Sequence, residues 1–85
     1  MKLNARTASL IAVGASVTAN CQPCLEINAV RAAKCGSEPQ EIADAVEIGR
    51  KVRAGAAAKF DAFAAGLGVT DPAASQAGAV CGCGS

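Results

Sequence analysis

Two cysteines separated by two residues, in the run Cys21-Gln22-Pro23-Cys24, are the residues of this chain best suited to chemistry. Pro23 is typical of the first turn of a helix, where its missing N–H costs nothing. The free N–H groups and the positive dipole end of a helix start stabilise a thiolate. Cysteines three positions apart across such a start also close a disulfide with little backbone movement. The motif therefore predicts a redox-active dithiol, with Cys21 and Cys24 as its catalytic residues and no cofactor.

A soft-metal site is the alternative interpretation of the same two cysteines. A closed structural zinc site needs four ligands of the cysteine or histidine type. The chain has no histidine, but Cys81 and Cys83 near its end complete a set of four thiolates with Cys21 and Cys24. Such a set suits Cu(I) or Zn. A third interpretation, in which the cysteines are merely buried, also stays open. For the protein as a whole, a non-catalytic oligomeric scaffold that has lost its chemistry is a further alternative.

Two helices are expected to flank the motif. Residues 7–19 are apolar almost all round, which is typical of a helix buried in the fold or in an oligomer. Residues 23–35 are predicted to form the second helix, and Gly36 is a natural left-handed stop. The cysteine pair then lies in the break between the two helices, at the start of the second.

A third helix is expected to begin with a capping box formed by Ser37 and Gln40. Gly55 kinks or ends it, so that residues 56–67 are either its continuation or a fourth short helix. The side chains expected to face inward are those of Ile42, Ala45, Val46, Gly49, Val52, Phe60, Phe63 and Leu67.

Charged residues of the third helix are expected on its solvated side. Glu47 and Lys51 have the spacing of an i,i+4 ion pair. Arg50, Lys51 and Arg53 form a small basic cluster, for which a solvated helix face is the expected role.

Composition limits the fold to one small helical domain. The chain has 85 residues, of which 52% are hydrophobic and only 2% aromatic, so a sheet fold lacks its usual β-branched and aromatic residues. We expect an all-α fold of three to four helices over residues 1–68, followed by a flexible Gly/Ala-rich tail over residues 69–85 that contains the Cys-x-Cys pair. A chain this small has too little surface to cover its apolar first helix, which favours a homo-oligomer.

The remaining signals concern partners and location. A net charge of +1 and the scarcity of aromatic residues predict no nucleic-acid partner. The apolar stretch at residues 8–19 mimics a signal peptide, but Asn20 stands where cleavage before a lipidated Cys21 needs a small residue. Because the stretch is also too short for a membrane span, we expect no membrane partner and a cytoplasmic protein.

The cysteine motif and its surroundings resemble a known family. Residues 9–28, SLIAVGASVTANCQPCLEIN, and residues 49–61, GRKVRAGAAAKFD, are similar to short members of the carboxymuconolactone decarboxylase family, on its alkylhydroperoxidase D-like side. The resemblance implies an all-helical subunit that assembles into trimers or hexamers. It also implies a dithiol that reduces peroxides and is re-reduced by a thiol partner, with Cys24 as the attacking thiol and Cys21 as the resolving one.

The same resemblance shows what the chain lacks. Active members place a glutamate twelve residues before the first cysteine and a histidine four after the second, and some have another histidine just before the second cysteine. These positions hold Ser9, Asn28 and Pro23 here. None of the three can relay protons, so peroxide reduction is expected to be slow, and restoring Glu at position 9 with His at position 28 is expected to raise it.

Other residues are weaker candidates for a supporting role. Arg31 shares a helix face with Cys24 and Asn28, and either supports a thiolate or is a solvated surface charge. Cys35 lies on the same face and is expected to be a small buried hydrophobic residue. Glu26 points away from Cys24, so it does not replace the missing glutamate.

Overall fold

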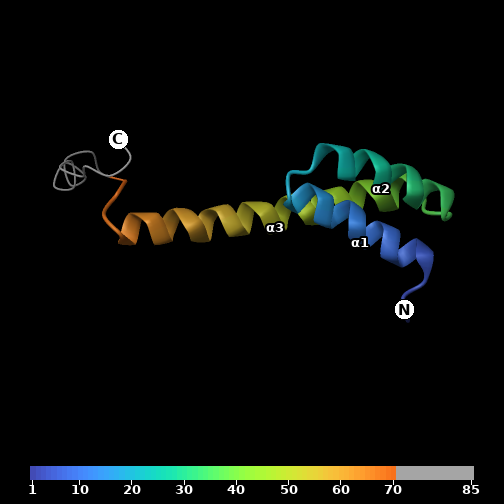
Figure 1. Cartoon of the computed structure of the whole chain (residues 1–85), viewed down its shortest axis with the longest axis horizontal. Coiled ribbons are helices and arrows are strands. Elements are labelled where there is room, and N and C mark those ends of the chain that lie inside the picture. The colour runs from blue at the N-terminus through green and yellow to red at the C-terminus, as the bar shows by residue number, and fades with distance from the viewer. Residues whose placement is uncertain (71–85) are drawn as a thin grey trace, which may run out of the picture. The chain divides into compact units, whose positions relative to one another are not determined.

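The structure, a computed structural model, describes residues 1–70 and contains three helices over that range. They are α1 (Ala5–Thr18), α2 (Gln22–Lys34) and α3 (Pro39–Gly66), shown in Figure 1. The described part of the chain has no strand, which confirms the all-α expectation. Residues 56–66 continue α3 through Gly55 rather than forming a fourth helix.

The chain divides into two compact units, Met1–Gly55 and Ala56–Ser85. The first unit contains α1, α2 and the beginning of α3. The second contains the rest of α3 and is described only to residue 70. The expected tail therefore lies almost wholly outside the described residues.

Side-chain caps set where the first two helices begin. Asn4 precedes α1, and its side-chain oxygen accepts a hydrogen bond from the Thr7 N–H at 2.8 Å. This cap starts the helix two residues before the predicted position. Cys21 occupies the same place before α2, while Gly36, at φ 93°, ends that helix as predicted.

The start of α3 differs from the prediction by one residue. The carboxylate of Glu41 accepts a hydrogen bond from the Glu38 N–H at 2.8 Å, and it also forms an ion pair with Arg6. The backbone bond first, and the Arg6 contact second, hold the pKa of the Glu41 carboxyl below its usual range. The predicted box of Ser37 and Gln40 was wrong: the buried Ser37 hydroxyl has no hydrogen-bond partner within residues 1–70, and Gln40 donates to Asp44 instead.

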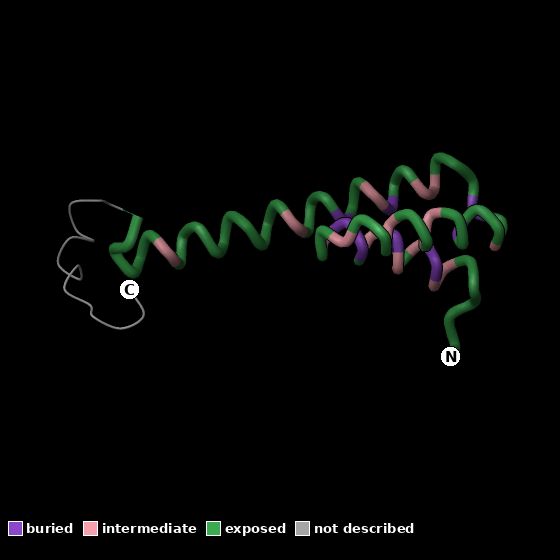
Figure 2. Tube along the Cα trace, turned by 45° about the horizontal axis from the view of Figure 1, so that its top comes forward, coloured by how far each residue is buried: buried purple, intermediate pink, exposed green. Residues whose placement is uncertain are grey.

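The core lies in the first unit and is small. Its buried hydrophobic side chains belong to Val13, Val17, Ala32 and Ala45. Leu10, Leu25, Ile42 and Val46 pack around this cluster. All of the buried positions in Figure 2 belong to α1, α2, the loop after α2 and the beginning of α3.

α1 and α3 approach each other at a pair of glycines. A Cβ atom built on Gly49 overlaps the carbonyl oxygen of Gly14 and lies 2.9 Å from the Cβ of Val17. A Cβ on Gly14 lies 3.1 Å from the carbonyl oxygen of Ala45. The Thr18 hydroxyl lies beside this contact, 3.1 Å from the Gly14 carbonyl oxygen and 3.0 Å from that of Gly49, and donates toward both. The two helices therefore touch through their backbones.

Several side chains expected in the core are exposed instead. Phe60 and Phe63, in the second unit, are 67% and 63% exposed, and their rings form a tilted pair with a centroid distance of 6.5 Å. Leu67 and Val52 are exposed as well. Glu47 pairs with Arg50 at 3.5 Å, and not with Lys51 as predicted.

The glycine contact makes a direct prediction about stability. We expect Gly49→Ala to lower the free energy of unfolding by about 1–3 kcal/mol, because its methyl group overpacks the α1–α3 contact. Gly55→Ala is the matched control, since nothing lies within 4 Å of its Cβ position. There the same substitution is expected to stabilise the helix by about 0.5–1 kcal/mol. Urea unfolding followed by circular dichroism measures both, and an equal effect of the two substitutions contradicts the close contact.

Candidate functional site

Cys21 and Cys24 are joined by a disulfide at the start of α2, with their Cα atoms 5.2 Å apart. Cys21 is the N-cap residue of the helix, and its sulfur accepts a hydrogen bond from the Cys24 N–H at 3.3 Å. Cys21 is partly buried, whereas Cys24 is exposed. The two cysteines thus form a dithiol/disulfide pair over the free N–H groups of a helix start.

The backbone before Cys21 forms a tight turn that holds this pair in place. Asn20 has a positive φ of 56°, which asparagine tolerates better than most residues. The Cys21 N–H donates to the Ser16 carbonyl oxygen at 3.0 Å. Pro23 then lies in the first turn of α2, as predicted.

Asn28, where the resemblance puts a histidine, is part of a chain of neutral hydrogen bonds. Its side-chain N–H donates to the Ser16 hydroxyl at 3.0 Å, and that hydroxyl donates to the Ala12 carbonyl oxygen at 2.7 Å. Ser16 is buried. The chain of bonds joins α2 to α1 but contains no group that exchanges protons near neutral pH.

Ser9, where the resemblance puts a glutamate, is not brought to Asn28. Its buried hydroxyl donates to the Arg6 carbonyl oxygen at 2.9 Å. Ser9 lies two turns before Ser16, about 10 Å along the helix axis. Ser16, and not Ser9, is therefore the residue of α1 that is hydrogen-bonded to the side chain of Asn28.

Arg53 is the residue of this site that sequence reasoning missed. The expected solvated face is confirmed for Arg50 and Lys51, which are exposed, but Arg53 is half-buried. One of its guanidinium nitrogens donates to the Asn20 side-chain oxygen at 2.9 Å and to the Val17 carbonyl oxygen at 3.2 Å. Arg53 thereby ties α3 to the turn that precedes Cys21.

Arg53 also lines a small hollow together with Cys21. The hollow has a volume of about 220 Å³. Its other lining residues are Ser16, Val17, Asn20, Gln22 and Leu25. The position of Arg53 could have been inferred from the sequence. The face of α3 that meets α1 has residues at steps of four, namely Ala45, Gly49 and Arg53.

The other sequence candidates do not take part in the hollow. Arg31 is exposed on α2, two turns after Cys24. Cys35 is a free thiol after the last turn of α2 and is partly buried, rather than buried as expected. Glu26 is exposed.

The described residues, 1–70, contain neither a cluster of candidate metal ligands nor a helix that could span a membrane. No group of three or more candidate ligand side chains occurs in that part of the chain. Cys81 and Cys83, which the metal interpretation needs, lie outside the described residues. No helix in the described part is long and apolar enough to cross a membrane.

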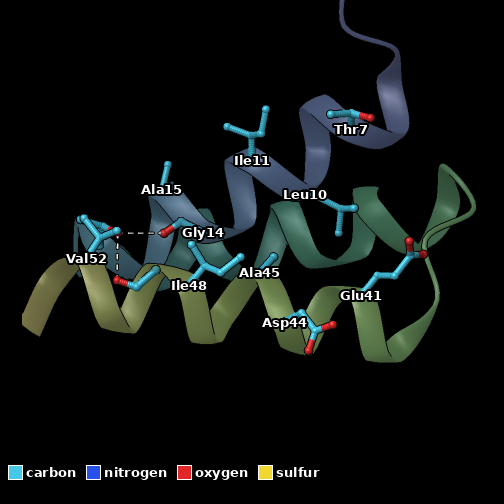
Figure 3. A pocket seen from close by; sticks show the side chains of 12 residues that line it. Thr7, Leu10, Ile11, Gly14, Ala15, Glu41, Asp44, Ala45, Ile48 and Val52 are labelled. Atoms are coloured by element: carbon cyan, nitrogen blue, oxygen red, sulfur yellow. Dashed lines mark hydrogen bonds between the residues drawn. The ribbon is translucent and has the colours of Figure 1, made fainter.

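A second, larger hollow lies between α1 and α3 and is almost wholly apolar. This groove has a volume of about 530 Å³. Figure 3 shows Ile11, Ile48 and Val52 along it, with Glu41 and Asp44 at one end. Its lining residues in the described part of the chain include no cysteine and no basic residue, so the groove is separate from the dithiol site.

One comparison with known proteins finds a match. The model of the carboxymuconolactone decarboxylase family matches residues 1–67, which include all of the site described above. No curated protein and no solved structure matches the chain.

The geometry predicts which cysteines pair on oxidation. Mild oxidation of the reduced protein is expected to join Cys21 to Cys24 within one chain, because their Cα separation already suits a disulfide. Cys35 is expected to remain a free thiol and to be alkylated more slowly than Cys21 in the reduced native protein. Peptide mapping after differential alkylation measures both, and a native Cys35 that reacts as fast as Cys21 contradicts the assignment.

Proposed function

The chain belongs to the carboxymuconolactone decarboxylase family, and we propose that it is a thiol–disulfide oxidoreductase of the alkylhydroperoxidase D-like kind. The observation that carries this proposal is the Cys21–Cys24 disulfide at the N-cap of α2. A sulfur that accepts a backbone N–H at a helix start is stabilised as a thiolate once the bond is reduced.

The proposed cycle moves two electrons. A thiol partner reduces the disulfide: two partner thiols become one partner disulfide, and the protein gains two thiols. The reduced pair then passes the electrons on, either to a disulfide or to a peroxide. With a peroxide, one protein thiolate attacks an oxygen and releases an alcohol, and the second thiol attacks the resulting sulfenic acid and releases water.

Disulfide exchange suits this site better than peroxide reduction. An alkoxide that leaves from a peroxide needs a proton, which a positioned acid supplies in efficient catalysts. Here the positions nearest to the family's relay hold Asn28 and Ser16, whose hydrogen bond to each other is neutral. A thiolate is a much better leaving group than an alkoxide and departs without being protonated. Disulfide exchange therefore depends far less on the missing proton relay than peroxide reduction does. We place this activity in the cytoplasm, where thiol reductants are abundant.

A histidine at position 28 is expected to restore part of the proton relay. Residue 28 lies one turn after Cys24 on α2, and the Ser16 hydroxyl is placed to orient a ring there. We expect Asn28→His to raise the rate of peroxide consumption with a dithiol reductant by about tenfold. This gain is smaller than that of a typical general acid–base catalyst, because the introduced ring is not positioned as precisely. The gain is expected to depend on pH in the range where histidine titrates.

The control for this prediction is Asn28→Gln, which keeps an amide and adds no proton donor or acceptor that titrates. A wild-type protein that already consumes peroxide as fast as Asn28→His contradicts the argument from the missing relay. Failure of both Cys21→Ser and Cys24→Ser to reduce exchange with a small disulfide contradicts the proposed function itself.

We also propose that a second copy of the chain covers the groove between α1 and α3. Within residues 1–70 of a single chain only four hydrophobic side chains are buried, while Ile48 in the groove is 62% exposed. A chain of this size buries too little surface to be more than marginally stable alone. Large apolar patches of this kind mark interaction surfaces.

A charge in the groove is therefore expected to weaken self-association. Ile48→Glu is expected to shift the mass measured by light scattering at micromolar concentration toward the monomer, since the carboxylate is costly to bury in an apolar contact. Ala43→Glu adds the same charge to an exposed position of α3 outside the groove and is expected to leave the mass unchanged. A wild-type protein that is monomeric at this concentration contradicts the proposal.

A further inference from the structure

We propose that Cys21 is the thiol that attacks the partner, that Cys24 resolves the resulting mixed disulfide, and that Arg53 is the positioning residue that holds the Cys21 thiolate. This order is the reverse of the one that the family resemblance implies. The inference rests on the proposed thiol–disulfide function and goes beyond it by giving each cysteine its own role.

The first observation is the hydrogen bond to the sulfur of Cys21. As the N-cap residue, Cys21 directs its sulfur at the N–H of Cys24, 3.3 Å away. An N-cap acceptor satisfies one of the free N–H groups of the first turn, and a negative charge strengthens that bond. Cys24 contributes its N–H to this bond, and its own sulfur accepts no hydrogen bond within residues 1–70. The helix start therefore stabilises charge on Cys21 more than on Cys24.

The second observation is the charge of the hollow beside Cys21. Arg53 is the only charged side chain among the seven that line it. Of the other six, Ser16 and Val17 belong to α1, Asn20 and Cys21 to the turn before α2, and Gln22 and Leu25 to α2. The bonds to the Asn20 side chain and the Val17 carbonyl oxygen keep the guanidinium at this place. Both bonds use a single nitrogen, and a guanidinium has five N–H donors, so donors remain for a thiolate or for an anionic partner.

The reaction order follows from these two observations. The Cys21 thiolate attacks one sulfur of a partner disulfide, a bond forms between the two sulfurs, and the other partner sulfur leaves as a thiolate. The exposed Cys24, after losing its proton to solvent, attacks the Cys21 sulfur and expels the second partner thiolate. The protein ends with the Cys21–Cys24 disulfide, and the partner ends with two thiols.

The test measures the alkylation of each cysteine in the full reduced protein as a function of pH. Iodoacetamide is the neutral probe, iodoacetate is the anionic one, and peptide mapping assigns the label to Cys21 or Cys24. We expect Cys21 to be labelled several-fold faster than Cys24 at neutral pH, with its pH midpoint the lower of the two. We also expect the ratio of the iodoacetate rate to the iodoacetamide rate to be higher at Cys21 than at Cys24.

Substitution of Arg53 separates its charge from its structural bonds. Arg53→Gln is expected to slow labelling of Cys21 at neutral pH by about threefold, to raise its pH midpoint, and to lower the iodoacetate ratio at Cys21 only. Arg53→Lys keeps the charge and is expected to keep most of the iodoacetate preference. Arg50→Gln removes the same charge one turn away, at an exposed position paired with Glu47, and is expected to change neither rate. A structural role alone does not move the pH midpoint in this selective way.

Each outcome decides one part of the proposal. Faster labelling of Cys24 in the wild type overturns the order of attack and leaves the proposed function intact. Equal effects of Arg53→Gln and Arg50→Gln overturn the role of Arg53. The wild-type comparison of Cys21 with Cys24 stands even where Arg53→Gln fails to fold. If neither cysteine is labelled faster than Cys35 and no Cys21–Cys24 disulfide forms, the proposed function fails as well.

Discussion

The backbone contact between Gly14 of α1 and Gly49 of α3 is the constraint on which the rest of the first unit depends. Without side chains at these two positions, the helices come close enough for the Thr18 hydroxyl to reach a carbonyl oxygen on each of them. The same approach places Arg53, one turn after Gly49, beside the end of α1. A larger residue at Gly49 overlaps the Gly14 carbonyl oxygen, so we expect it to push the helices apart and to weaken the bonds of Arg53 to the turn before Cys21. The dithiol on α2 is therefore held partly by a contact between the two other helices.

The chemistry of the site follows from which groups stand around the sulfurs. A helix start and an arginine stabilise negative charge, which favours thiolate exchange. The hydrogen bonds from Asn28 to Ser16 and from Ser16 to Ala12 position α2 against α1 but transfer no protons near neutral pH. The site thus has groups suited to stabilising a thiolate. Within residues 1–70, it has no side chain placed to donate a proton to an alkoxide that leaves from a peroxide. This combination is the physical reason for proposing disulfide exchange as the main activity.

Local patterns were enough to predict the elements and the position of the cysteine pair. Pro23 and Gly36 limit α2, and the cysteine motif lies at its start, because proline and glycine act on the backbone directly. The box at Ser37 and Gln40 was misplaced by one residue, since Glu41 competes for the same role and also has Arg6 beside it. The role of Arg53 was not predicted, because it depends on how α3 packs against α1. The local pattern of charges carries no information about that packing. Phe60 and Phe63 were expected in a core for their hydrophobicity, but periodicity alone does not tell whether one chain supplies the covering surface.

The proposed function requires that Cys21 and Cys24 form a reversible two-electron couple. Equilibration of the protein in dithiol/disulfide buffers of graded ratio, followed by acid quenching and intact mass spectrometry, measures this couple directly. We expect a single transition between two species that differ by two hydrogen masses, with the two-electron dependence on buffer ratio. We also expect this transition to disappear in Cys24→Ser and to persist in Cys35→Ser. A wild-type protein whose mass stays that of the dithiol in every buffer, or a transition that requires Cys35, means that Cys21 and Cys24 do not form such a couple.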